Sequence, residues 1–212
     1  MSKRSNPRAE QLRRALAQEA ARIMSEQGID DYLLAKRKAA ERLGATDIAV
    51  LPKNSEIEEA LAEHHRLFEA NTHSSTLSAL RRTALQAMRL LKRFEPRLVG
   101  PVLSGTASAH SEVNLHLFAE GAEPVALYLL ERGIPHRIGE RRLRYEPNRL
   151  VAYPVVQFVA GDREIDAVVF PLNGIRQSPA SPVDGRPMRR ADTDEIESLL
   201  AEKPVAERSA WE

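Results

Sequence analysis

Hydrophobic residues recur at helical spacing through the first part of the chain, up to about Phe94. From Arg8 to Gly28 they fall three or four positions apart, which is the period of an amphipathic helix. Similar stripes run through residues 30–44, 54–70 and 75–94. Gly28 and Gly44 end the segments 8–28 and 30–44 as C-caps. The pattern therefore predicts four consecutive helices.

After Pro96 the helical period gives way to short apolar runs and to alternation of apolar and polar residues. Such runs, separated by turn residues, are typical of β-strands. Residues 123–133 are an exception, because they keep a helical pattern and end in a glycine. The Gly-Asp pair at 161–162 indicates a short hairpin between the last two strands. The predicted strands cover residues 98–104, 112–118, 134–146, 153–161 and 163–171.

The order of these elements predicts an α+β fold, in which a helical N-terminal region precedes a mixed β-sheet domain with flanking helices. We place the helical region at residues 1–72 and the α+β domain at residues 73–200. A loop rich in Pro, Gly and Ser, residues 172–191, follows the last strand, and its prolines favour an ordered conformation packed over the sheet. A short helix begins near Asp192, and residues 201–212 form a polar tail.

The composition is that of an ordinary globular protein, with 42% hydrophobic and 29% charged residues among 212. The sequence has no cysteine, which excludes disulfides, thiolate metal ligands and cysteine nucleophiles. No apolar run approaches the ~20 residues that span a bilayer, and the basic start of the sequence lacks a signal-peptide core. We therefore expect a cytoplasmic, bacterial-type protein with no membrane partner.

The net charge of +1 hides an uneven distribution. Residues 1–98 hold 18 Lys and Arg against 13 Asp and Glu, whereas residues 99–212 hold 13 against 17. A basic half fits a module that faces nucleic acid, although surface cations on helices give the same imbalance. Four cations on one predicted helix either contact RNA or DNA phosphates or form a solvated face. They are Lys36, Arg37, Lys38 and Arg42.

Several common catalytic and nucleotide-binding motifs do not occur in the sequence. It has no G-x-S-x-G, no P-loop and no G-x-G-x-x-G, so a serine hydrolase and a P-loop or Rossmann protein have no support. It also lacks H-E-x-x-H. The adjacent His64 and His65 would point about 100° apart on a helix, so they cannot easily share a metal ion.

The segment 98–118, LVGPVLSGTASAHSEVNLHLF, carries the clearest candidate chemistry. Glu112 and Asn114 stand at positions i and i+2 of a predicted strand, so their side chains share one face. Glu164 and Asp166 have the same spacing on a later strand. Side-chain oxygens from two neighbouring strands can hold divalent metal ions beside a turn of small residues whose amides approach phosphates. The same alternation is also that of an ordinary half-exposed strand.

With these residues, the region from about 75 to 170 resembles the nucleotidyltransferase superfamily that includes polymerase-beta-like enzymes. The family pattern is an apolar strand, a Gly-Ser turn, an Asp-x-Asp strand and a later lone acid, for which this sequence has Ser-Gly, Glu-x-Asn and Asp166. The resemblance implies that Glu112, Asn114 and Asp166 hold Mg²⁺ or Mn²⁺, with Glu112 and Asp166 in the catalytic role. It also implies that the turn and an arginine-rich strand bind the triphosphate. These residues are Ser104, Gly105, Thr106, Arg142 and Arg144.

The departures from the family pattern leave two main functions open. Asn114 replaces a carboxylate with a weaker Mg²⁺ ligand, and the spacer from Gly105 to Glu112 is shorter than is usual. One function is metal-dependent transfer of a nucleoside monophosphate from a nucleoside triphosphate to an RNA or protein acceptor. The alternative is a catalytically inactive relative that binds nucleic acid or a partner protein through its basic helices and arginine strand. A purely structural interaction domain is a third option.

Overall fold

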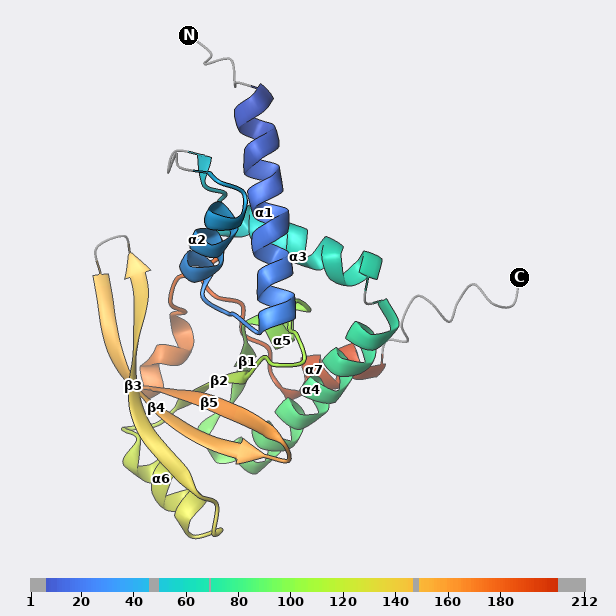
Figure 1. Cartoon of the computed structure of the whole chain (residues 1–212). Helices are drawn as coiled ribbons and strands as arrows, with labels where there is room; N and C mark the ends of the chain where they lie inside the picture. Colours follow the sequence, from blue (N-terminus) through green and yellow to red (C-terminus); the bar gives the residue numbers. More distant parts are fainter. Residues whose placement is uncertain (1–6, 46–49, 69, 147–148, 202–212) are drawn as a thin grey trace. The chain divides into compact units, whose positions relative to one another are not determined.

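The structure is a computed structural model, and it combines an N-terminal set of helices with a mixed sheet (Figure 1). Helices come first and a five-stranded sheet with flanking helices follows, so the predicted α+β fold is confirmed. None of the described helices is long and apolar enough to cross a membrane. The predicted polar tail lies outside the described residues, apart from Ala201, which ends the last helix. The structure describes residues 7–45, 50–68, 70–146 and 149–201.

The chain divides into two compact units, one formed mainly by residues up to His73 and the other mainly by residues from Ser74 onward. The first unit contains the helices α1 (Pro7–Gln27), α2 (Tyr32–Arg42) and α3 (Asn54–Phe68). Their apolar stripes face one another, as the helical period predicts. The buried core of this unit includes Leu16, Ala20, Ile23, Ala35, Ala39, Ile57 and Leu61.

The second unit is built on a sheet with the strand order β1-β2-β5-β4-β3. Strands β2 and β5 are parallel, and the other neighbouring pairs are antiparallel. Strands β1 and β3 therefore form the two edges of the sheet. The strands are β1 (Arg97–Val99), β2 (Val113–Phe118), β3 (His136–Glu146), β4 (Arg149–Ala160) and β5 (Arg163–Phe170).

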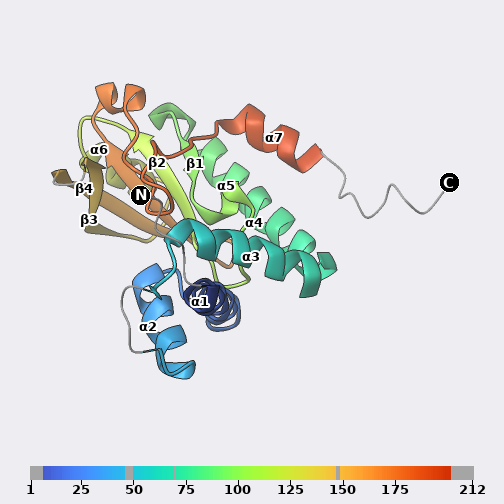
Figure 2. The same cartoon turned by 90° about the horizontal axis from the view of Figure 1, so that it is seen from above.

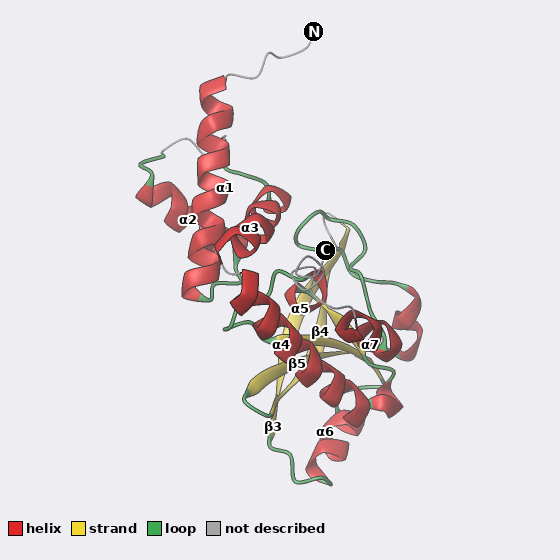
Figure 3. Ribbon diagram, turned by 90° about the vertical axis from the view of Figure 1, so that its right-hand side faces the viewer, coloured by secondary structure: helices red, strands yellow, loops and turns green. Residues whose placement is uncertain are grey.

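The two faces of the sheet are covered differently. On one face, side chains such as Leu115 and Ile165 share a core with residues of the flanking helices. The other face holds a smaller apolar cluster around Phe170, and it also carries Asn114 and Asp166, so we call it the polar face. The helices of this unit are α4 (Ala70–Leu90), α5 (Pro101–Ser104), α6 (Glu123–Leu130) and α7 (Thr193–Ala201), with short 3₁₀ turns η2 (Lys92–Phe94) and η3 (Leu172–Arg176). Figures 2 and 3 show α4 and α6 beside the sheet.

The strand predicted at residues 98–104 is wrong over most of its length. Strand β1 ends at Val99, and residues Pro101–Ser104 form the short helix α5 instead. Gly100 between them has a φ of 72°, a backbone conformation that favours glycine and breaks the strand. The following Pro101 has no amide proton to give to a β-ladder but fits the first position of a helix.

Strands β3 and β4 continue past the part of β4 that pairs with β5. Strand β5 pairs with β4 from Val155 to Ala160, whereas β3 pairs with β4 as far as Arg149. Residues 140–146 and 149–154 therefore form a two-stranded extension, which we call the ribbon (Figure 1). A two-stranded segment needs support from the rest of the fold, because alone it is marginally stable.

The loop after β5 touches both edges of the sheet. The amide of Ala180 donates to the carbonyl of Arg144 on β3 at 2.6 Å. Leu98 on β1 exchanges two backbone hydrogen bonds with Ala191, at 2.8 and 3.0 Å. The loop predicted at residues 172–191 is therefore ordered at these points and reaches from one edge of the sheet to the other.

Replacement of Leu115 by alanine should destabilise the second unit by about 2–5 kcal/mol, because Leu115 is fully buried in the central part of the sheet. Leu127→Ala on α6 is the matched control, since that leucine is 57% exposed and its loss should cost under about 0.5 kcal/mol. Urea denaturation of the two variants measures both effects. Equal losses would contradict the assignment of the core.

Candidate functional site

Polar side chains form a row across three neighbouring strands on the polar face. Asn114 on β2 is in register with Asp166 on β5, and Asp166 is in register with Gln157 on β4. Paired residues on adjacent strands project to the same side of a sheet, so these side chains are neighbours. Glu112 stands two residues before Asn114, and its carboxyl lies close enough to Asp166 for that carboxylate to raise its pKa. The structure thus brings together Glu112, Asn114 and Asp166, which the sequence singled out as one group.

The guanidinium of Arg141, on β3, lies between two of these side chains. One of its terminal nitrogens donates to Oδ1 of Asn114 at 2.9 Å, and the other forms an ion pair with Oδ2 of Asp166. The second oxygen of Asp166 accepts a hydrogen bond from Gln157 Nε2 at 2.8 Å. Asp166 is only 2% exposed. Both oxygens of this buried carboxylate therefore have partners within the protein.

Glu112 has an unusual protonation behaviour in this setting. Its burial is the main cause that raises its pKa to about 7, and the charge and hydrogen bond of Asp166 add to the effect. Glu164 contributes less, and Arg141 acts in the opposite direction. Close to neutral pH, Glu112 is therefore protonated in a large fraction of molecules and can donate a hydrogen bond to Asp166.

The residues of this row do not fit the divalent metal site that the family resemblance implies. Within the described residues, no group of three or more His, Asp or Glu side chains is placed to hold a metal ion. Asn114 contributes a neutral oxygen, and that oxygen already accepts from Arg141. A divalent cation between Asn114 and Asp166 would have to displace a guanidinium of the same sign of charge. The expectation that Mg²⁺ or Mn²⁺ is held here has no support from the geometry.

The predicted phosphate-binding turn, Ser104 to Thr106, lies at the C-terminal end of α5. The Ser104 and Thr106 hydroxyls are 2.9 Å apart and hydrogen-bond to each other, and Gly105 follows the helix with a φ of 92°. The end of a helix presents carbonyl oxygens rather than amides, which does not favour an anion. Contact of these three residues with phosphate stays a prediction.

The turn that adjoins the row is the one at Gly100, which the sequence analysis missed. A Cβ atom built on Gly100 would lie 3.7 Å from Nδ2 of Asn114, so the backbone passes close to that side chain. The sequence does indicate a turn there, because a glycine stands between the apolar run Leu98-Val99 and a proline. Eleven residues, 101–111, separate it from Glu112, a longer spacer than the one counted from Gly105.

The arginines predicted to bind a triphosphate, Arg142 and Arg144, lie on the opposite side of the sheet from Asp166. Arg141 pairs with Tyr153 on the polar face, and side chains alternate along a strand. Arg142 and Arg144 are exposed on the other face of the ribbon. Their neighbour Arg141, in the same arginine-rich strand, is the one that reaches the row of Glu112, Asn114, Asp166 and Gln157, which we call the acidic row. Only the strand register distinguishes these neighbours, and the register is set by pairing with β4.

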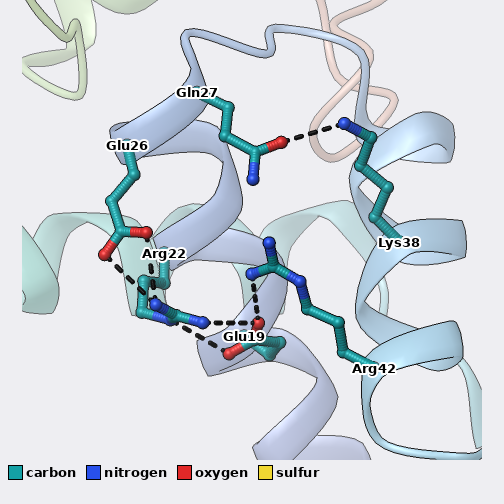
Figure 4. Close-up of polar contacts among 6 residues, drawn as sticks. All are labelled: Glu19, Arg22, Glu26, Gln27, Lys38 and Arg42. Atoms are coloured by element: carbon teal, nitrogen blue, oxygen red, sulfur yellow. Dashed lines mark hydrogen bonds and ion pairs between the residues drawn. The ribbon is translucent and has the colours of Figure 1, made fainter.

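Two of the four cations predicted to bind nucleic acid join α2 to α1 (Figure 4). Arg42 donates to Oε1 of Glu19 at 2.9 Å, and Nζ of Lys38 donates to Oε1 of Gln27 at 2.9 Å. Lys36 is partly buried, and burial lowers its pKa although Glu56 opposes this. Arg37 is exposed. Nucleic-acid binding by this helix stays a prediction.

A second arginine, Arg190, lies over the polar face beyond Asn114. Its Nε donates to Nδ1 of His116 at 3.0 Å, and its guanidinium carbon is 5.0 and 4.9 Å from the ring centroids of Phe118 and Phe170. One terminal nitrogen donates to the carbonyl of Gly174 at 2.9 Å. Burial, followed by the charges of Arg190 and Arg141, lowers the pKa of His116 to about 3. His116 is therefore neutral and serves as an acceptor that fixes the loop.

No protein-family model matches the sequence, and no curated protein matches it. Among solved structures, a cytoplasmic RNA terminal U-transferase matches with a TM-score of 0.29 and 17% identity, over 54% of this chain and 34% of that one. The RNA terminal uridylyl transferase Cid1 matches with a TM-score of 0.28 and 16% identity, over 55% of this chain and 37% of that one. The chain thus spans about a third of the length of each. Similarity at this level assigns neither a family nor an activity.

Replacement of His116 by glutamine should make the free energy of unfolding depend less strongly on pH in the acid range. The folded pKa of about 3 lies below the ordinary value of 6.5, so the unfolded chain binds more protons between these values. This contribution is complete above pH 6.5 and is lost as the pH falls toward 3. Urea denaturation at several pH values should show a slope smaller by up to about 1.4 kcal/mol per pH unit in the variant.

Glu112→Gln is the control for this experiment, because its effect has the opposite sign. The folded pKa of about 7 lies above the ordinary 4.5, so the native protein binds more protons in this window and its stability falls as the pH rises. The variant should remove that fall. An unchanged pH profile in His116→Gln would contradict a neutral His116.

Proposed function

We propose that the chain is a nucleotidyltransferase-like domain that binds nucleic acid and does not transfer nucleotides. The observation that carries the proposal is the ribbon, whose outer face presents Arg142 and Arg144 to solvent while its inner face holds Arg141 against Asp166. Exposed arginines on a projecting ribbon are suited to contact successive phosphates of a nucleic-acid backbone.

The outer face of the ribbon is open along its length. Glu140, Arg142, Arg144, Leu150 and Ala152 are all exposed on it. The arginines outnumber the acids there, although Glu140 lies 3.6 Å from Arg142 and offsets part of its charge. Exposed ion pairs of this kind are weak and exchange readily for a phosphate contact. The surface is therefore accessible and basic, as a sequence-independent phosphate contact requires.

The acidic row supports the second half of the proposal, the lack of transfer chemistry. Nucleotidyl transfer depends on divalent cations that offset charge building up on the phosphates. Here Asn114 stands in place of a carboxylate, and Asp166 is neutralised by Arg141. The row has one buried carboxylate that is paired and one carboxyl, Glu112, whose pKa is raised to about 7. This set lacks the anionic charge that a two-metal site needs.

Metal-dependent transfer to RNA or protein is the second candidate. The observation that favours it is that Glu112 lies beside Asp166 and has a raised pKa, because a cation could replace the proton that Glu112 holds near neutral pH. In this candidate Glu112 and Asp166 would be catalytic and Asn114 an auxiliary ligand. The ion pair of Arg141 with Asp166 opposes it.

Simultaneous replacement of Arg142 and Arg144 by alanine should weaken the binding of single-stranded RNA. The dependence of log affinity on log salt should become shallower by roughly 0.7 for each phosphate contact that is lost. Fluorescence anisotropy at several salt concentrations measures both quantities. Arg82→Ala combined with Arg89→Ala on α4 removes the same charge from exposed positions and should change binding less. Equal losses in the two double variants would refute the ribbon as the binding surface.

A transfer assay separates the two candidates. We expect no incorporation into RNA from ATP, GTP, CTP or UTP, with either Mg²⁺ or Mn²⁺, because Arg141 occupies the acidic row. Incorporation that requires a divalent cation and disappears in Asp166→Ala would establish the second candidate instead.

A further inference from the structure

The two side chains to which the Arg141 guanidinium donates are residues that the family resemblance assigns to a metal ion. The guanidinium bonds to Oδ1 of Asn114 at 2.9 Å with one nitrogen and to Oδ2 of Asp166 with the other. These oxygens come from adjacent strands and converge on one cation. The nitrogens of a planar guanidinium can satisfy two oxygens at once, which an isolated lysine ammonium does less well.

Arg141 is not the β3 residue that lies in register with Asp166 and Gln157. Asp166 and Gln157 are in register with Arg137, and Arg141 lies four residues farther along β3. Four residues span about 13 Å of strand, which is more than an arginine side chain covers. The contact therefore requires the ribbon to bend over the polar face, and the ion pair holds it there.

With Arg141 in place, the charge of Asp166 is offset and the oxygens of Asn114 and Asp166 have hydrogen-bond donors. Asp166 is 2% exposed and carries one negative charge, which the guanidinium offsets. Gln157 satisfies its other oxygen at 2.8 Å. The half-buried Asn114 side chain supplies a neutral acceptor, and an aspartate there would add a second negative charge opposite the one guanidinium. Asparagine is thus the residue that matches a single positive charge.

We propose that Arg141 is a built-in replacement for the divalent cation, and that it anchors the ribbon to the sheet through Asn114 and Asp166. The site holds its own cation, and Mg²⁺ and Mn²⁺ do not bind there. The inference rests on the proposed function in one respect, because it makes nucleic-acid binding by the ribbon independent of metal. Metal binding and RNA binding are measured separately, so each can fail without the other.

The test compares the full-length wild type with the double variant Asn114→Asp and Arg141→Gln, in which the built-in cation is removed and a carboxylate is added. Thermal unfolding in millimolar Mn²⁺ and in EDTA, together with the Mn²⁺ paramagnetic resonance signal, reports binding. We expect no Mn²⁺ effect on the wild type. The double variant should bind Mn²⁺ and gain several degrees in Tm, because a ligand that binds the folded state stabilises it.

Controls distinguish a specific site from adventitious binding. Arg142→Gln removes a neighbouring charge from the opposite face and should leave the protein insensitive to Mn²⁺. RNA affinity of the wild type should be equal in Mg²⁺ and in EDTA. Binding of Mn²⁺ by the wild type would overturn the inference whether or not the double variant folds. A folded double variant that ignores Mn²⁺ would overturn it as well.

Discussion

A buried carboxylate on the central strand β5 imposes the main constraint on this structure. Asp166 is almost entirely removed from water, and an unpaired charge in such a place is strongly unfavourable. The fold meets this constraint with Arg141 from the edge strand and Gln157 from the neighbouring strand. Because Arg141 belongs to the ribbon, neutralising Asp166 also decides where the ribbon lies. The same contact occupies the space between Asn114 and Asp166, where we propose that no divalent cation binds.

A second arginine, Arg190, also packs its guanidinium on the polar face. Arg190 lies over the aromatic rings of Phe118 and Phe170 and donates to a neutral His116. A protonated histidine could not accept this hydrogen bond and would repel the arginine, so burial of His116 in its neutral form supports the loop conformation. Two arginines from different segments thus lie on this side of the sheet beside its smaller apolar cluster.

The proposed function follows from the different surroundings of the arginines on the two faces of strand β3. Alternation on β3 turns Arg141 inward and Arg142 and Arg144 outward. The inward arginine is committed to the acidic row, whereas the outward pair is free of the sheet interior and accessible to a polyanion. A shared fold does not fix chemistry, which depends on the charges at a site. Here those charges favour binding over transfer.

The sequence by itself determined the elements and the α+β order, because hydrophobic period, glycine caps and turn residues act locally. It also placed Glu112 with Asn114, and Asp166 with Glu164, since spacing of two along a strand shares a face. Local pattern failed at Gly100 and Pro101, where a positive φ and a missing amide ended the strand early. Only the tertiary structure decided which arginine meets Asp166, because that contact joins residues 25 positions apart. Strand register and the bend of the ribbon create the ion pair, and neither is encoded in any short stretch of sequence.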